Sequence, residues 1–422
     1  MHLVIATIAL LTVFASQALA LTCGVGEKTE FGASFNPVLK IKPNTGGTRV
    51  DHGQSFTVQS VRLQLSLRAP DKPIDGFVVI RDKYFRVLAT ITPADFKGDS
   101  GGYGVSRWTG RLPALHEIYL ELATNEPGDI HLEVNRGTAT PSASAETRLF
   151  SVIGAQPAWA RLSEIHEVGP RRAGYAVGML LTGETAAPGA PASPTWCCSG
   201  AMITSSLFLT NWHCGGSGGI EADYWTQAVC NQAIIDLGWN AAVGTDPQDA
   251  PIGLSQQVGC QHVVAKDRRL DYAILRVGAI IGPGGISGTP IPATINAAPV
   301  SEGDVYVVHH AQCQPKLVSK NCRIQNAALP AWTGPDAPAL NATPNFSHNC
   351  DTEPGSSGGP VFNTSRELIG IHHAGFDRDA DCKPIDPRVN KAIGMNAIMQ
   401  HLEKQYPSIR REIKARGFNE FR

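Results

Sequence analysis

Short strand-like runs separated by turn sequences are the feature that most restricts how this chain can fold. In the first third of the chain, turn-forming stretches with Asp, Pro and Gly separate four alternating or β-branched runs: Ser55–Ser66, Gly76–Ile91, Glu117–Ala123 and Asp129–Val134. Such spacing is typical of a small antiparallel β-sandwich. This part has no pattern of an active site, so we interpret it as an accessory domain or pro-domain.

Strand-like runs recur in the rest of the chain: Ala176–Leu181, Gly200–Leu209, Leu270–Val277, Asp304–Val308, Val361–Phe362 and Leu368–His372. Helical periodicity is clear only at the end, where Ile398, Leu402 and Tyr406 are spaced by four and precede Ser408–Arg416 and Gly417. The fold class is therefore predicted to be all-β, with a terminal helix that closes the second part.

Residues 137–146 have the small, polar, proline-containing composition of a linker. We divide the chain into a signal peptide at 1–20, a β-rich N-terminal domain at 21–136, a linker and candidate processing region at 137–172, and a second domain at 173–422.

The N-terminus predicts export. An apolar run from Leu3 to Phe14 precedes Ala18-Leu19-Ala20, which fits a signal-peptide cleavage site. No later stretch reaches the roughly 18 apolar residues that span a bilayer. Lys plus Arg number 36 and Asp plus Glu 37, so no global field attracts nucleic acid or an anionic membrane. We expect a secreted or periplasmic protein without nucleic-acid or membrane partners after signal removal.

All ten cysteines follow the predicted signal peptide. In an exported chain an even number of cysteines indicates disulfides rather than free thiols. The sequence contains no Cys-x2-Cys pair and no His-x3-His pair, which zinc sites commonly use. We therefore expect neither a metal nor another cofactor.

A turn rich in small residues lies within Cys350–Asn363 and reads Gly355-Ser356-Ser357-Gly358-Gly359-Pro360. Glycines permit positive φ and close approach of a substrate to the backbone. Such a turn can present Ser357 as a nucleophile while the amides of Gly355 and Ser357 converge on the oxygen of a tetrahedral intermediate.

Two further residues supply a base and its partner. An apolar strand from Ser206 ends at His213, and Cys198, fifteen positions earlier, is placed to bond Cys214 and hold that imidazole. Asp271 stands at the start of the strand-like run to Val277. Its carboxylate could accept a hydrogen bond from the ring of His213 and set its tautomer. The alternative is an ordinary surface aspartate that begins a strand.

In this order, Thr210–Cys214, Asp271–Leu275 and Gly355–Pro360 resemble the three catalytic motifs of the trypsin/chymotrypsin-like serine proteases. The resemblance covers roughly residues 173–405. Thr352–Gly358 and Val307–His310 are most similar to the bacterial lysyl endopeptidases, and Ile369–His372 to the bacterial glutamyl endopeptidases.

The resemblance implies a double six-stranded β-barrel with a cleft between the barrels, and hydrolysis of peptide bonds in proteins or peptides through an acyl-enzyme. Ser357 would be the nucleophile, His213 the base and then the acid, and Asp271 the residue that orients it. The amides of Gly355 and Ser357 would form the oxyanion hole.

Three positions depart from the trypsin pattern. Ser356 stands where trypsins keep the aspartate that pairs with the new N-terminus after zymogen cleavage, which implies that this switch is absent. Asn211 and Trp212 replace two small residues before the histidine. His373 replaces a serine beside the catalytic aspartate, as it does in the lysyl enzymes.

The same resemblance implies where substrate binds. His373-Ala374-Gly375 would be the cleft edge to which the peptide adds as a strand. Asp351 falls where trypsins hold the acid that binds Lys or Arg, whereas His372 matches a histidine that recognises Glu in the glutamyl enzymes. Lys391 would enter the same pocket and, if it reached Asp351, would cancel its charge. We expect a slight preference for Lys or Arg before the cleaved bond, with a Glu/Asp preference as the alternative.

Arg171-Arg172 lies close to where mature trypsin-like domains begin, so we expect the accessory domain to be removed there, although an unprocessed surface pair is a simple alternative. Further expected disulfides are Cys230–Cys260, Cys313–Cys322, Cys350–Cys382 and Cys23–Cys197. Two rival functions remain: a non-catalytic binding protein that retains a protease fold, and a hydrolase of small esters that uses the same serine.

Overall fold

The computed structural model describes most of the chain in seventeen ranges: residues 30–35, 39–51, 58–68, 76–92, 95–98, 103–106, 109–113, 117–125, 131–141, 152–153, 156–183, 194–216, 223–240, 257–279, 291–329, 345–377 and 383–417. The predicted signal peptide at 1–20 lies outside these residues. None of the helices in the described ranges is long and apolar enough to cross a membrane.

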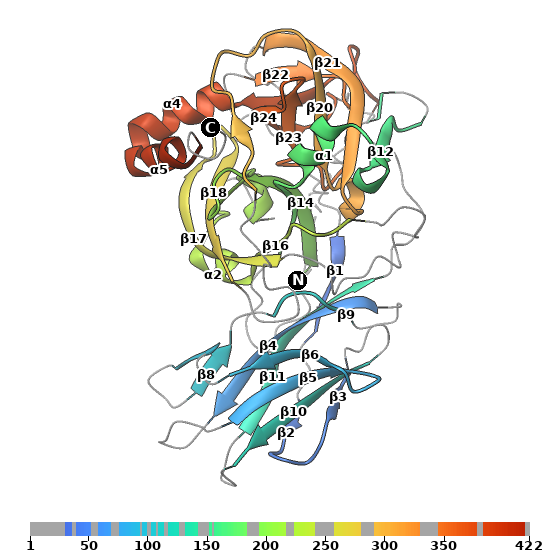
Figure 1. The fold of residues 1–422 in the computed structure, drawn as a ribbon, viewed down its shortest axis with the longest axis vertical. Helices are drawn as coiled ribbons and strands as arrows, with labels where there is room; N and C mark the ends of the chain where they lie inside the picture. The colour runs from blue at the N-terminus through green and yellow to red at the C-terminus, as the bar shows by residue number, and fades with distance from the viewer. Residues whose placement is uncertain are drawn as a thin grey trace, which may run out of the picture.

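The N-terminal part consists of two small antiparallel sheets with one shared core (Figure 1, lower half). Alternate residues are buried along Ile118–Thr124, which shows that one face of its sheet packs inward. Leu63 and Leu65 of one sheet and Ile80 and Leu120 of the other meet in that core. One sheet runs in the order β3 (Thr48–Val50), β10 (Ile118–Thr124), β5 (Gly76–Asp82), β6 (Val87–Ile91). The other is formed by β11 (His131–Pro141), β4 (Val58–Arg68), β8 (Tyr103–Ser106), β7 (Phe96–Gly98), β2 (Lys40–Ile41) and β9 (Leu112–Pro113).

One strand joins this part to the rest of the molecule. β1 (Glu30–Phe35) pairs with β11 on one side and with β14 (Pro194–Met202) on the other, so the strands form one continuous thirteen-stranded sheet. The predicted linker at 137–146 is wrong for its first five residues, because β11 continues to Pro141 and remains paired with β4. Small residues such as Gly137 and Ala139 are accommodated there by cross-strand hydrogen bonds.

The first barrel is a closed ring of six antiparallel strands. Phe208, Trp225 and Leu275 fill its interior. The predicted single strand over 200–209 is two strands, because the main chain turns back between Ile203 and Leu207. The ring runs β13 (Val177–Gly183), β16 (Ile234–Asp236), β17 (Gln257–Asp267), β18 (Tyr272–Gly278), β15 (Leu207–Thr210), β14, and a β13–β14 pairing closes it.

The second barrel is a second closed ring of six, with β12 (Trp159–Arg161) and β19 (Thr294–Ile295) added at its sides. A β21–β22 pairing closes the ring, and the predicted chymotrypsin-like double barrel is thereby confirmed. Its strands run β21 (Leu317–Leu329), β20 (Asp304–His309), β23 (Pro360–Asn363), β24 (Glu367–Ala374), β25 (Asn390–Gly394), β22 (Asn345–His348).

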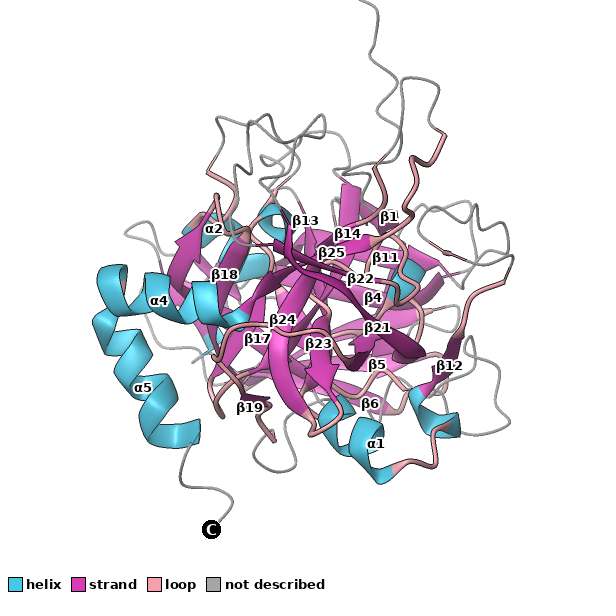
Figure 2. Cartoon of the chain, turned by 90° about the horizontal axis from the view of Figure 1, so that it is seen from above, coloured by secondary structure: helices cyan, strands magenta, loops and turns pink. Residues whose placement is uncertain are grey.

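Two C-terminal helices, α4 (Met395–Gln405) and α5 (Pro407–Gly417), lie together beside the strands (Figure 2). They replace the single helix predicted, because Pro407 disfavours the helical conformation at Tyr406, whose φ and ψ are −135° and 56°. Ile398 and Leu402 pack into the core between the barrels. Two short helices, α1 (Val168–Gly174) and α2 (Gln227–Gln232), complete the described elements that matter here.

Four disulfides lie within the described residues: Cys197–Cys313, Cys198–Cys214, Cys230–Cys260 and Cys322–Cys350. The second and third were predicted. The predicted pairs Cys313–Cys322, Cys350–Cys382 and Cys23–Cys197 are wrong, because their members bond elsewhere. Cys313 lies in the β20–β21 turn beside β14, whereas Cys322 faces the strand that pairs with β21. Cys23 and Cys382 lie outside the described residues.

Candidate active site

The three candidate catalytic residues come from both barrels. His213 begins a short 3-10 turn after β15, and Asp271 directly precedes β18. Because β15 and β18 are paired antiparallel, with Thr210 opposite Ala273, the end of one strand lies beside the start of the other. Ser357 belongs to the loop that enters β23 of the second barrel.

Asp271 makes two hydrogen bonds with His213. Its Oδ2 lies 2.8 Å from the ring Nδ1, and its Oδ1 accepts from the main-chain N–H of the same histidine at 3.0 Å. Asp271 is fully buried and has a φ of 42°, a left-handed conformation that aspartate tolerates better than most residues. Asn211 donates its side-chain amide to the Asp271 carbonyl at 2.8 Å and so fixes the two segments together. Its contribution was not predicted.

The carboxylate of Asp271 is held in its ionised form. Burial alone would raise its pKa, but the charge of the His213 ring, its hydrogen bond and the nearby His373 together lower the pKa to about 2. His373 Nδ1 lies 3.5 Å from Asp271 Oδ2. Burial lowers the pKa of His373 itself, which favours a neutral imidazole on that side of the carboxylate. The negative charge is therefore available to stabilise a positive ring at His213.

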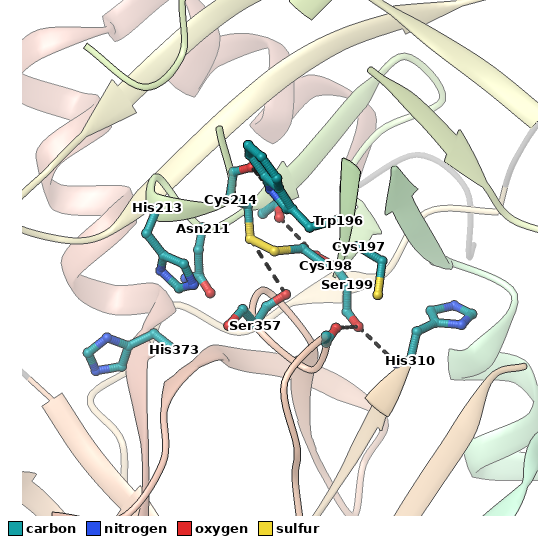
Figure 3. Close-up of a disulfide and its surroundings, with 12 residues drawn as sticks. Trp196, Cys197, Cys198, Ser199, Asn211, His213, Cys214, His310, Ser357 and His373 are labelled. Atoms are coloured by element: carbon teal, nitrogen blue, oxygen red, sulfur yellow. Dashed lines mark hydrogen bonds between the residues drawn. A yellow bond between two sulfur atoms is a disulfide. The ribbon is translucent and has the colours of Figure 1, made fainter. Parts of the chain in front are cut away.

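The side chain of Ser357 points toward the rings of His213 and His373 (Figure 3). Its main-chain carbonyl is turned the other way and accepts from the N–H of Ser199 at 2.7 Å. The loop before it contains glycines in the left-handed region, with φ of 97° at Gly355 and 81° at Gly358. A Cβ at Gly358 would lie 2.2 Å from the Ser199 carbonyl oxygen, so only glycine fits this approach.

The main-chain N–H groups of Gly355 and Ser357 make no hydrogen bond with any part of the chain that the structure describes. Neighbouring groups in the same loop are used: the N–H of Ser356 donates to Glu353, and that of Gly358 donates to His372, both at 2.8 Å. Buried main-chain donors are rarely left without a partner. Two available donors beside Ser357 are what an oxyanion hole requires.

Comparison with known proteins agrees with this geometry. Residues 198–371 match the family described as the trypsin-like peptidase domain. A search of the curated protein sequences finds no significant match.

Solved structures similar to this chain include an HtrA-type protease, AlgW, with a tripeptide, at 16% identity and a TM-score of 0.38, covering 57% of this chain and 63% of that one. Rv3671c from M. tuberculosis H37Rv, in an inactive form, has 17% identity and a TM-score of 0.37, covering 60% and 98%. A serine endoprotease from Yersinia pestis has 18% identity and a TM-score of 0.33, covering 56% and 64%. The matched region thus spans slightly under two thirds of AlgW.

The peptidase domain holds His213 through the Cys198–Cys214 disulfide, which links the histidine turn to β14. The indole of Trp196 donates to the Cys214 carbonyl at 2.9 Å and supports the same turn. The two sulfurs and a ring nitrogen of His213 lie within 4.8 Å of one another. Because both sulfurs are bonded in the disulfide, neither is a thiolate able to bind a metal.

A chain of buried hydrogen bonds supports the serine loop from below. The Ser319 hydroxyl donates to the Asp351 carbonyl at 2.6 Å and lies 2.8 Å from His309 Nε2. His309 Nδ1 lies 2.7 Å from the Ser356 hydroxyl, which accepts from the Glu353 N–H. Since the Ser319 proton is used, His309 donates through Nε2 and accepts at Nδ1. Ser356, where trypsins keep an aspartate, therefore takes part in a neutral network, and sequence reasoning missed His309 and Ser319.

The carboxylate of Asp351 is not paired with a cation. It is 4% exposed, and its two oxygens accept from the main-chain N–H groups of Ile153 at 2.8 Å and Ala158 at 2.7 Å. The expectation that Lys391 might reach Asp351 is not met. Lys391 Nζ instead lies 2.9 Å from the carboxylate of Asp377 and donates to the Gly375 carbonyl at 3.1 Å.

His372 and His373 follow each other on β24 but have different surroundings. His373 lies beside Asp271, whereas His372 Nδ1 is 3.3 Å from His348 Nε2. The Cys350 N–H donates to His348 Nδ1 at 3.2 Å, so His348 must donate through Nε2, and His372 keeps its own proton on Nε2. Burial lowers the pKa of His348 to about 3 and that of His372 well below its usual value.

The predicted substrate edge lies where β24 ends. Ala374 is the last residue of β24 and pairs with Lys391 of β25, after a register shift that follows His372. Gly375 lies just beyond the strand. Whether a peptide adds to this segment stays a prediction.

Proposed function

We propose that this protein is a serine endopeptidase that cleaves peptide bonds through an acyl-enzyme. The observation that carries the proposal is the buried Asp271–His213 pair beside Ser357, next to two main-chain donors without partners in the described chain. The trypsin-like match over residues 198–371 supports the same reaction class.

In the proposed reaction, Ser357 Oγ attacks the substrate carbonyl carbon while its proton passes to His213 Nε2. The electron pair of the carbonyl moves to its oxygen, which the N–H groups of Gly355 and Ser357 would stabilise. His213 then protonates the amine as the C–N bond breaks, and a water molecule hydrolyses the resulting ester by the same two steps. Asp271 stabilises the protonated ring throughout, because it stays ionised.

The test compares wild type with Ser357→Ala on casein and a peptide library, and with a fluorophosphonate probe. We expect labelling and cleavage by wild type and neither by the variant. Ser301→Ala, at an exposed serine, is the matched control and should behave like wild type. No labelling of wild type would favour a binding protein, and labelling without peptide cleavage would favour an esterase.

The contacts of Asp351 and His372 bear on the preferred side chain. Asp351 has both oxygens bonded to main-chain amides, so its charge is already compensated. His372 retains an N–H on Nε2, a donor suited to an acceptor such as a carboxylate. Within the proposed function we therefore propose that Glu or Asp is preferred before the cleaved bond, in place of the Lys/Arg preference expected from sequence.

A peptide library that varies this position tests the preference. We expect kcat/KM for Glu to exceed that for Lys, and His372→Gln to reduce the ratio by at least about tenfold. Asp351→Asn should leave the ratio unchanged. A wild-type preference for Lys or Arg that Asp351→Asn abolishes would reverse this assignment.

Four disulfides in the described residues indicate an oxidising, extracytoplasmic compartment. We propose that the protein is secreted or periplasmic. Identification of the mature N-terminus in culture medium and in periplasmic extract tests this.

A further inference from the structure

We propose that the Cys197–Cys313 disulfide and Ser199 are positioning groups that hold the Pro354–Gly355 peptide with its N–H toward the reacting carbonyl. The inference deepens the proposed function and rests on it. It concerns how this chain maintains an oxyanion hole when Ser356 replaces the aspartate of the trypsin switch.

The orientation of this peptide follows from one hydrogen bond. The Pro354 carbonyl accepts from the main-chain N–H of Gln312 at 2.6 Å. The peptide is trans, so its C=O and N–H point in opposite directions. While Gln312 holds the carbonyl, the N–H of Gly355 must point away from the Gln312 turn. A flipped peptide would lose this bond and would present a carbonyl oxygen where the oxyanion needs a donor.

The Gln312 turn requires an anchor of its own. Gln312 and Cys313 have φ of 53° and 57°, the left-handed region that non-glycine residues seldom occupy. Such conformations persist where the surrounding structure enforces them. Here Cys313 is bonded to Cys197 of β14, and its N–H donates to the His310 carbonyl at 3.0 Å. The disulfide therefore ties the turn to the strand that also carries Cys198 (Figure 3).

Ser199, two residues after Cys197, contacts both the turn and the serine loop. Its buried hydroxyl accepts from the His310 N–H and donates to the Gly355 carbonyl, each at 2.8 Å. Its N–H donates to the Ser357 carbonyl. The Gly355 carbonyl is thus held as firmly as that of Pro354, which fixes the peptides on both sides of Gly355.

The turn and the loop are in direct contact. A Cβ at Gly355 would lie 2.6 Å from the His310 carbonyl oxygen and 3.0 Å from the sulfur of Cys197. Displacement of the turn would therefore be transmitted to Gly355 itself. Loss of an oxyanion donor lowers kcat by about 10²–10³, with little effect on ground-state binding.

The decisive variant is Cys197→Ser/Cys313→Ser, with Cys230→Ser/Cys260→Ser as a control that removes a disulfide from α2 and β17. We expect kcat to fall about tenfold to a hundredfold in the first and KM to change by less than about threefold. Affinity for a peptide aldehyde, which forms a tetrahedral adduct with serine, should fall in parallel. The control should keep kcat and aldehyde affinity within about twofold of wild type, at a temperature where both variants are folded.

Ser199→Ala tests the same idea with every disulfide intact, and is decisive if the double variant does not fold. It should lower kcat and aldehyde affinity together, while binding of the cleaved product peptide is unchanged. Unchanged kcat in the folded variants, or a rise in KM alone, would overturn the proposal. An inactive wild type would instead overturn the proposed function, so the two failures are distinguished.

Discussion

At the scale of single residues, the buried histidines have the clearest energetic consequence. Burial, with a smaller effect of neighbouring histidines, lowers the pKa of His309 and of His348 to about 3. In the unfolded chain both would titrate near 6.5. The unfolded state therefore binds more protons below this pH. The stabilising contribution is complete above pH 6.5 and is lost as the pH falls toward 3.

We predict that the free energy of unfolding decreases from pH 7 to pH 5 by about 2 kcal/mol for each of these two histidines. Urea unfolding at several pH values measures the decrease. His348→Gln should reduce the pH dependence, although it also lowers stability at pH 7 by removing the bond to the Cys350 N–H. A stability that is constant between pH 7 and pH 5 would show that these side chains are not buried as neutral rings.

Asp271→Asn should lower kcat by about 10⁴-fold with KM nearly unchanged, because an amide can neither stabilise the protonated ring of His213 nor maintain its tautomer. Steady-state kinetics on the best library peptide measures the effect. Asp223→Asn, at an exposed aspartate, is the control. Loss of less than tenfold would mean that His213 does not depend on this carboxylate.

At the scale of elements, disulfides connect segments that are distant in the chain. Cys197–Cys313 joins β14 of the first barrel to the β20–β21 turn of the second and closes a separation of 116 residues. Cys230–Cys260 joins α2 to β17 across only 30 residues. A longer closed loop restricts the unfolded chain more strongly.

We predict that Cys197→Ser/Cys313→Ser lowers the free energy of unfolding by about 4–5 kcal/mol and Cys230→Ser/Cys260→Ser by about 3 kcal/mol. Urea unfolding of both variants under non-reducing conditions measures the order. A larger loss for the shorter loop would indicate that packing around α2, rather than loop closure, determines the effect.

At the scale of the whole molecule, the N-terminal sheets and the first barrel share a buried ionic contact. Arg111 of the N-terminal part is fully buried and lies 3.0 Å from the carboxylate of Asp236 in β16. Its guanidinium also covers the ring of Trp239, and its N–H donates to Gln257 at 2.8 Å. Burial lowers the pKa of Arg111 and raises that of Asp236, so each charge depends on its partner.

Arg111→Met should therefore lower the free energy of unfolding by about 3–5 kcal/mol, because Asp236 is left buried without its partner. Arg111→Met/Asp236→Asn should recover part of the loss. Arg49→Met, which breaks an exposed pair with Glu117, should cost at most about 1 kcal/mol. Equal losses in the single and double variants would show that packing, not charge pairing, dominates this contact.

The same contact bears on processing. Arg171-Arg172 lies in α1, while β12 and the main-chain groups that bind Asp351 lie before it in the chain. We predict that a chain cut after Arg172 keeps its N-terminal fragment bound through β1, β12 and Arg111. Size-exclusion chromatography in native buffer and mass spectrometry of the peak measure this. Separate elution of the fragments without denaturant would contradict it.

The sequence by itself determined the strand periodicity, the double barrel and the order of His213, Asp271 and Ser357, because these follow from local patterns of side chains and glycines. It also determined Cys198–Cys214, whose members flank one hairpin. Only the tertiary structure decided that Cys313 bonds Cys197, that Asp351 binds main-chain amides, and that Lys391 faces Asp377. Such partners depend on how each barrel closes and how the two barrels meet, which no short stretch of sequence encodes.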